Sequence, residues 1–108
     1  MRFYIAALAV LLAGSVMADA PSARKVQTCK TYSSLAKTIM SARQNGIPMA
    51  DMMEKVAAMD EDPVKNLASL MVTTAYDTNR FSSEEYKQKA VSDFENTFFS
   101  SCIKSKLQ

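Results

Sequence analysis

Glycine is almost absent from this chain: after residue 18, Gly46 is the only one in 90 residues. β-rich domains of this size connect their strands through tight turns, which normally need several glycines. The same 90 residues repeat apolar side chains at three- and four-residue steps, the spacing of one face of an α-helix. Together these features predict one small all-α domain.

The first two predicted helices flank this glycine. One begins near Arg24 and ends before Gly46, because glycine readily takes the left-handed conformation that follows many helix C-termini. The next begins after Pro48 and covers about residues 49–59. Helical spacing on the first helix predicts an apolar face of Cys29, Tyr32, Leu35, Ala36, Ile39 and Met40 opposite a polar face of Lys30, Ser33, Ser34, Lys37 and Ser41.

A third helix is predicted from its N-terminal signals. Asp62 suits the N-cap position, and Pro63 suits the first helical position because the missing N–H is not needed there. The segment from residue 76 to residue 80 contains turn-forming residues and reads as the following connection. The apolar stripe of this helix is predicted to contain Val64, Leu67, Ala68, Met71, Val72 and Ala75.

The start of a fourth helix is marked by two overlapping capping signals. Ser82 and Glu85 have the spacing of a capping box, with Ser82 as the N-cap. Phe81 and Tyr86 are placed to form a hydrophobic staple across it. This helix is predicted to continue to about Lys104. Its buried face is predicted to contain Ala90, Val91, Phe94, Phe98, Cys102 and Ile103.

The first 18 residues have the composition of a secretory signal peptide. Fifteen of them are apolar, Arg2 precedes the apolar run, and small residues follow it. The unbroken run from residue 3 to residue 13 is shorter than the ~20 residues that span a bilayer, which argues against the alternative of a membrane anchor. We predict cleavage after Ala18, with Ala20 as the other possible frame. A loose leader (19–23), one helical domain (24–105), a frayed tail (106–108) and a periplasmic or secreted location are then expected.

Cys29 and Cys102 are the only two cysteines. In an oxidising compartment they are expected to form one disulfide that ties the first helix to the last. A closed loop of about 74 residues corresponds to roughly 4 to 4.5 kcal/mol in the chain-entropy model. The alternative is a redox-active or intermolecular thiol, but there is no C-x-x-C motif to favour it.

The residue types that are missing exclude several functions. The chain contains no His, which removes Ser-His-Asp and Cys-His catalysis and imidazole zinc sites. After residue 18 the net charge is +1, because all eleven acids and twelve of the thirteen Lys/Arg lie there. A charge this small argues against nucleic-acid binding driven by counterion release. We therefore expect no catalysis, no cofactor, no metal and no nucleic acid.

Met49, Met52 and Met53 form a sulfur-rich group at helical spacing. Thioether sulfur suits Cu(I), so the group is a candidate copper site. Methionine also fills cores and adaptable apolar surfaces well, and core or interface packing is the favoured interpretation. An exposed cluster would suit a protein partner or a holdase-type chaperone.

A second candidate site lies at helix ends, where binding residues are common. It comprises Arg43, Gln44, Tyr76, Asp77 and Arg80, and an ion pair between Arg43 and Asp77 is possible. The favoured interpretation is structural. In it, Arg43 and Gln44 cap helix carbonyls and Asp77 forms an Asx-turn.

Residues 42–49 read Ala-Arg-Gln-Asn-Gly-Ile-Pro-Met, and Met52-Met53, Ala75-Tyr76, Phe94 and Cys102 follow in order. This pattern resembles small exported helical proteins of proteobacteria and their phages, a group without an assigned activity. The resemblance covers most of residues 29–102, implies a bacterial or prophage origin, and supplies no site. The chain is also similar to periplasmic acid-stress chaperones in size, helicity and single disulfide, although its cysteines bridge almost the whole domain.

These observations predict an exported, non-catalytic protein-interaction module, for example a modulator of an envelope protein. The partner would be an envelope or periplasmic protein, and no membrane span would remain after signal cleavage. A methionine-rich Cu(I)-binding protein and a small holdase-type chaperone are the alternatives.

Overall fold

The structure, a computed structural model, describes residues 20–60 and 62–105. These ranges contain four α-helices and no strand, so the predicted all-α class is confirmed. The helices are α2 (Ala23–Gln44), α3 (Met49–Ala57), α4 (Asp62–Tyr76) and α5 (Glu84–Lys104). The predicted signal peptide and C-terminal tail lie outside the described residues.

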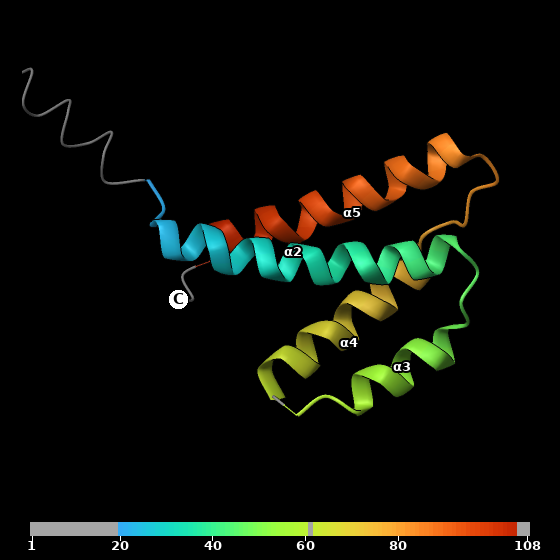
Figure 1. The fold of residues 1–108 in the computed structure, drawn as a ribbon, viewed down its shortest axis with the longest axis horizontal. Coiled ribbons are helices and arrows are strands. Elements are labelled where there is room, and N and C mark those ends of the chain that lie inside the picture. Colours follow the sequence, from blue (N-terminus) through green and yellow to red (C-terminus); the bar gives the residue numbers. More distant parts are fainter. Residues whose placement is uncertain (1–19, 61, 106–108) are drawn as a thin grey trace, which may run out of the picture.

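Helix α2 is the centre of the arrangement. It packs against both α5 and α4, whereas α3 packs against α4. Figure 1 shows α5 running antiparallel to α2 along its length, while α4 crosses α2 at one end and diverges from it at the other. None of the described helices is long and apolar enough to cross a membrane.

The predicted disulfide is present. Cys29 in α2 and Cys102 in α5 are bonded, and their Cα atoms lie 5.5 Å apart. The bond joins the N-terminal part of α2 to the C-terminal part of α5, so the first and last helices of the described chain are covalently linked.

The core draws apolar side chains from all four helices. Three fully buried alanines, Ala36 on α2 and Ala68 and Ala75 on α4, leave room for these two helices to approach closely. The remaining buried apolar residues are Cys29, Ile39, Met40, Met52, Val56, Met71, Val72, Val91 and Phe94.

Two expectations about helix faces and lengths need correction. Ser33, predicted on the polar face of α2, is buried at 5% exposure. Its hydroxyl donates to the carbonyl of Lys30 at 2.9 Å, and this local bond makes the burial possible. Helix α3 ends at Ala57, two residues earlier than predicted.

The start of α5 also differs from the prediction by one residue. The N-cap is Ser83, whose hydroxyl accepts from the backbone N–H of Tyr86 at 3.2 Å, and Ser82 lies outside the helix. Tyr86 therefore occupies the N3 position that the predicted capping box assigned to Glu85. The predicted contact between Phe81 and Tyr86 does form, with ring centroids 6.1 Å apart.

Candidate functional site

The C-terminal end of α2 is tied to the connection between α4 and α5 through Gln44, which is 1% exposed. Its Nε2 donates to the carbonyl of Asn79 at 2.8 Å, and its Oε1 accepts from the backbone N–H of Phe81 at 2.9 Å. Both ends of the amide are thus satisfied, which a buried polar group requires. We call the region formed by Arg43, Gln44, Gly46, Tyr76 and Arg80 the corner.

Three cations surround the end of α2 at the corner. Arg80 Nε and Lys87 Nζ both donate to the carbonyl of Gln44, at 3.1 and 2.5 Å. Arg43 Nε donates to the carbonyl of Thr78 at 3.1 Å. Cations are favourable here because the C-terminus of a helix carries partial negative charge.

The chain turns sharply at Gly46, which has φ +85°. The N–H of Gly46 donates to the carbonyl of Arg43, and the N–H of Ile47 donates to the carbonyl of Ala42. These are the two hydrogen bonds of a Schellman motif. The predicted role of Gly46 as the helix stop is therefore confirmed. An added Cβ would lie 2.9 Å from a guanidinium nitrogen of Arg80, so a side chain at this position would disturb the packing as well as the backbone.

Tyr76 closes the corner on the α4 side. Its hydroxyl donates to the carbonyl of Ile47 at 2.6 Å, and the guanidinium of Arg43 lies 5.3 Å from its ring centroid. Burial raises the pKa of Tyr76, while the charge of Arg43 opposes the shift and that of Asp51 adds to it. The phenol is thus held in its neutral form as a hydrogen-bond donor.

Four of the five residues predicted at helix ends meet at the corner, and Asp77 does not join them. Asp77 is exposed in the turn after α4, and no ion pair with Arg43 forms. Arg43, Gln44 and Tyr76 each bond to a backbone group of this chain, and Gln44 Nε2 also donates to the sulfur of Met40 at 3.6 Å. Their geometry is that of a structural joint.

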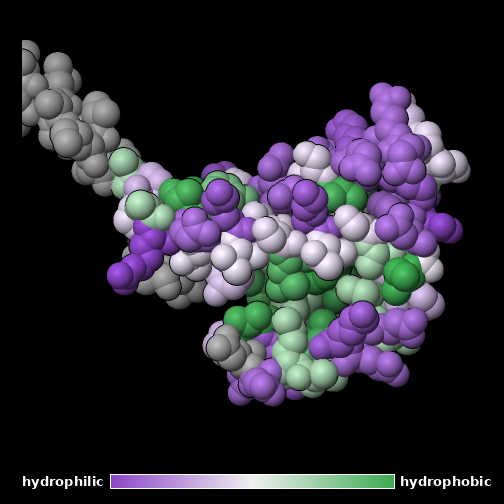
Figure 2. Space-filling model, viewed as in Figure 1, coloured by the Kyte–Doolittle hydropathy of each residue, from purple (hydrophilic) through white to green (hydrophobic). Residues whose placement is uncertain are grey.

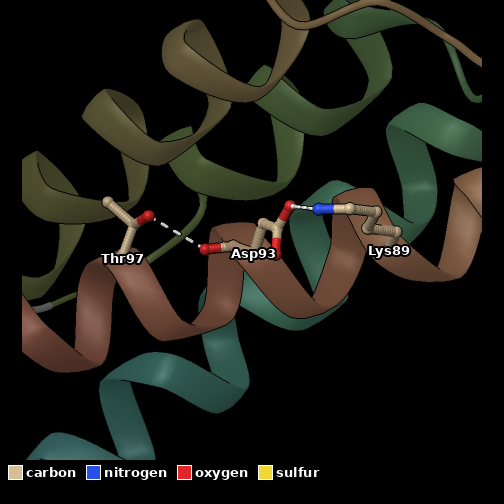
Figure 3. A network of polar contacts seen from close by, with 3 residues as sticks. All are labelled: Lys89, Asp93 and Thr97. Atoms are coloured by element: carbon tan, nitrogen blue, oxygen red, sulfur yellow. Dashed lines mark hydrogen bonds and ion pairs between the residues drawn. The ribbon is translucent and has the colours of Figure 1, made fainter.

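The ion pair found within the described ranges lies on the exposed face of α5. Lys89 Nζ lies 2.7 Å from Asp93 Oδ2, and the Thr97 hydroxyl donates to the Asp93 backbone carbonyl (Figure 3). The hydrogen bond and charge of Asp93 raise the pKa of Lys89. Both charged side chains are well exposed, at 67% and 63%, so the pair contributes little to stability.

The three methionines of α3 are divided between core and surface. Met52 is 8% exposed and belongs to the core, Met53 packs against the core, and Met49 is 39% exposed. Packing accounts for Met52 and Met53 without a ligand. Across the described residues, no group of three or more His, Cys, Asp or Glu side chains is placed to hold a metal ion.

A groove of about 490 Å³ opens where α4 diverges from α2 and α5. Figure 2 shows apolar surface exposed in the hollow between α2 and the α3–α4 pair. One stripe from each of three helices lines the groove. The lining residues are Lys25, Thr28, Cys29 and Tyr32 from α2, Pro63, Leu67, Leu70 and Met71 from α4, and Phe98, Ser101, Cys102 and Ser105 from the end of α5.

The groove has one polar end, and the rest of its lining is mainly apolar. Tyr32, Leu67, Leu70, Met71 and Phe98 form the apolar part, and Leu70 is 55% exposed. At the polar end, the ammonium of Lys25 donates to the backbone carbonyl of Ser105. This arrangement suits the binding of an apolar group.

The disulfide forms part of the groove wall. It fixes α2 and α5 to each other, and α4 faces them across the groove. The position of α4 depends instead on the corner at its other end. The two walls of the groove are therefore held by different means, one covalent and one through hydrogen bonds and core packing.

The sequence did not reveal this groove, although most of its lining residues were identified as apolar. Tyr32, Leu67, Met71 and Phe98 were predicted to face the core, and only Met71 among them is fully buried. The available signal was Leu70, which lies outside the predicted stripe of α4 and widens its apolar face. A face wider than one partner helix can cover leaves apolar surface exposed.

No protein-family model, curated protein or solved structure matches the chain. The resemblance to small exported helical proteins of proteobacteria and their phages stays a prediction. The groove and the corner are the two features from which a function can be inferred.

Proposed function

We propose that this chain is a non-catalytic interaction module of the bacterial envelope, and that it takes an apolar helical segment of another exported protein into the groove. The observation that carries the proposal is the 55% exposed Leu70 above an apolar groove. Burying a Leu side chain fully is worth roughly 1.5–3 kcal/mol. A partner that covers Leu70 gains part of this energy.

The dimensions of the groove fit a helix. Each wall extends over about two helical turns, as from Lys25 to Tyr32 on α2. Seven residue steps of helix correspond to roughly 10.5 Å. A bound helix presents apolar anchors at positions i, i+3 or i+4, and i+7, which span the same length.

The disulfide supports the proposal in two ways. It is consistent with an oxidising, exported location, where an envelope partner would be available. It also fixes two walls of the groove before binding, which lowers the ordering cost of association.

The proposed binding surface differs from the two that the sequence suggested. At the corner, Arg43, Gln44 and Tyr76 donate to backbone carbonyls of this chain. On α3, Met52 is part of the core. The groove is an opening of about 490 Å³, and it leaves apolar side chains such as Leu70 exposed.

Site-specific photocross-linking tests this proposal. A photoreactive phenylalanine at position 70 is compared with one at Asp93, an exposed position on α5 outside the groove. In envelope extract we expect one protein species to cross-link from position 70 and none from position 93, with the adduct mapping to an apolar helical segment. Circular dichroism of both variants checks that they remain folded.

Other results would overturn the proposal. Equal cross-linking from both positions would mean that the groove is not selective. Indiscriminate adducts with many unfolded polypeptides would favour the holdase alternative. If neither position forms an adduct, the proposal that the groove binds a protein partner is wrong.

A further inference from the structure

We infer that the segment bound in the groove is an acidic amphipathic helix, with a Glu or Asp at the end that meets Lys25. This inference rests on the proposed function and names the chemistry of its partner. An acidic residue on the partner would also explain why a groove with a mainly apolar lining has Lys25 at one end.

All the charged side chains of α2 are positive. Between Ala23 and Gln44 the helix contains five Lys or Arg and no Asp or Glu. Lys25 lies in its first turn, and among the described residues that line the groove it is the one Lys or Arg and there is no Asp or Glu. An acidic side chain entering at this end meets a cation without a competing acid from the same helix.

The ammonium of Lys25 is anchored by a hydrogen bond to this chain and can also bind an incoming acid. Among the described residues it donates to the carbonyl of Ser105. An ammonium group has three donors, so this bond does not prevent it from donating to an incoming carboxylate. The hydroxyls of Thr28 and Ser101 also line the groove and add further donors.

A helix fits the groove better than the other anionic amphiphile to consider, a fatty acid. The walls extend over roughly 10.5 Å. A bound helix needs only its anchor side chains inside the groove, whereas an extended long acyl chain would leave much of its apolar length uncovered. Leu70 and Leu67 lie three residues apart on α4, as side chains do that interlock with a second helix. A fatty acid and a second copy of the chain are outcomes of the test below.

The test uses three labelled helical peptides of about 18 residues, long enough to be helical alone. Each has Leu anchors at i, i+3 and i+7, and they differ only in carrying Glu, Gln or Lys one turn before the first anchor. Fluorescence anisotropy measures their affinity for the purified, disulfide-bonded protein. The variants are Lys25→Gln, Lys25→Arg, Leu70→Ser and the matched control Lys37→Gln, which removes an exposed charge of α2 outside the groove.

We expect the Glu peptide to bind about two- to five-fold more tightly than the Gln peptide, as a partly exposed ion pair would give, and the Lys peptide to bind most weakly. The preference should disappear in Lys25→Gln, persist in Lys25→Arg and Lys37→Gln, and shrink at high salt. If all three peptides bind equally well and Leu70→Ser weakens each of them, the inference of an acidic partner is wrong and the proposed function stands. Failure of every peptide to bind, displacement of the peptides by laurate, or dimerisation through the groove in sedimentation would overturn the proposed function itself.

Discussion

At the corner, α2 and α4 are joined by hydrogen bonds from buried or half-buried side chains to backbone carbonyls. In the groove, the same two helices stand apart, and apolar side chains lie between them. The corner fixes the angle at which α4 leaves α2, because Gln44 and Tyr76 hold the chain on both sides of the turn. The groove is the space that this angle leaves open. The disulfide holds together α2 and α5, which form the wall opposite α4.

This difference separates two roles within one small domain. Directional hydrogen bonds specify a single geometry, whereas exposed apolar side chains tolerate a partner and gain energy when covered. Changes at the corner should therefore lower stability, and changes at the exposed side of the groove should lower binding. The following variants test that division, beginning with the largest expected effect.

Removing the disulfide should cost the most. The double variant Cys29→Ala/Cys102→Ala is expected to lose about 4 kcal/mol of unfolding free energy, since the unfolded chain regains the freedom of a loop of about 74 residues. Urea denaturation measures the loss, and the wild-type protein with reductant is the control. A double variant that unfolds at the same urea concentration as the oxidised protein would show that the disulfide does not hold the groove wall.

Replacing Gln44 should have the next largest effect. Gln44→Leu leaves the Phe81 N–H and the Asn79 carbonyl without their partner, at a cost of about 2 kcal/mol. Gln44→Glu keeps an acceptor for Phe81 but, when ionised, cannot donate to Asn79. Gln44→Glu should therefore recover part of the stability lost in Gln44→Leu, because the bond from the Phe81 N–H is kept. The same loss for both variants in urea denaturation would count against the corner as a hydrogen-bonded joint.

Gly46→Ala should cost about 1–2 kcal/mol, because alanine is strained at positive φ. Part of the loss comes from the contact of the new Cβ with Arg80. A double-mutant cycle with Arg80→Ala separates backbone strain from this contact, and we expect the two changes to be non-additive. Strict additivity would mean that Arg80 moves aside without cost.

Tyr76→Phe should cost about 1 kcal/mol at neutral pH through loss of the hydrogen bond to Ile47. Because the folded pKa of Tyr76 is raised above its ordinary value of about 10, folding favours the protonated phenol. That contribution is fully present below pH ~10 and is lost as the pH rises through the folded pKa. The stability gap between wild type and variant should therefore narrow in strong alkali, and tyrosinate absorbance should lose its highest-pH component in the variant. A gap that stays constant through this range would contradict the role of the neutral hydroxyl.

Leu70→Ser should have the smallest effect on stability, within about 0.5 kcal/mol, because the side chain is 55% exposed. It should nevertheless weaken binding of an apolar helical peptide. Val72→Ser on the same helix is the contrast, since Val72 is fully buried and its loss should destabilise the fold. A large loss of stability in Leu70→Ser would assign Leu70 to the core.

The sequence predicted those parts of the fold that depend on neighbours along the chain. The apolar face of α2 and the stop at Gly46 follow from local spacing and backbone preference. The predicted N-cap role of Asp62 was wrong by one residue, because Asp62 is already the first residue of α4 and Pro63 is the second. The disulfide followed from the presence of only two cysteines. The choice between Ser82 and Ser83 as N-cap did not follow, because it depends on Phe81 being held by Gln44, a residue 37 positions away.

The candidate site was harder to predict for the same reason. Helical periodicity indicates that Tyr32, Leu67 and Phe98 are apolar-face residues, but not whether another helix covers them. Their partial exposure results from the angle between α2 and α4, and that angle is set by contacts at the corner between residues about 35 positions apart. Arg43, Gln44, Tyr76 and Arg80 do lie together at the corner, but Arg80 is in the connection between α4 and α5 and not at a helix end. Arg43 and Gln44 bond to that connection, whereas Tyr76 bonds to Ile47 after α2 and Arg80 bonds to Gln44.

Methionine methyl groups report directly on the division between groove and corner. Met71 and Met52 both belong to the core, but only Met71 also contributes to the groove lining, and Met49 is exposed on α3. In a protein labelled with ¹³C at the methionine methyls, addition of the Glu-bearing helical peptide should shift the Met71 signal and leave those of Met49 and Met52 unchanged. Shifts of Met49 with Met71 unmoved would place the binding surface on α3 and the corner, and would contradict the groove as the site of interaction.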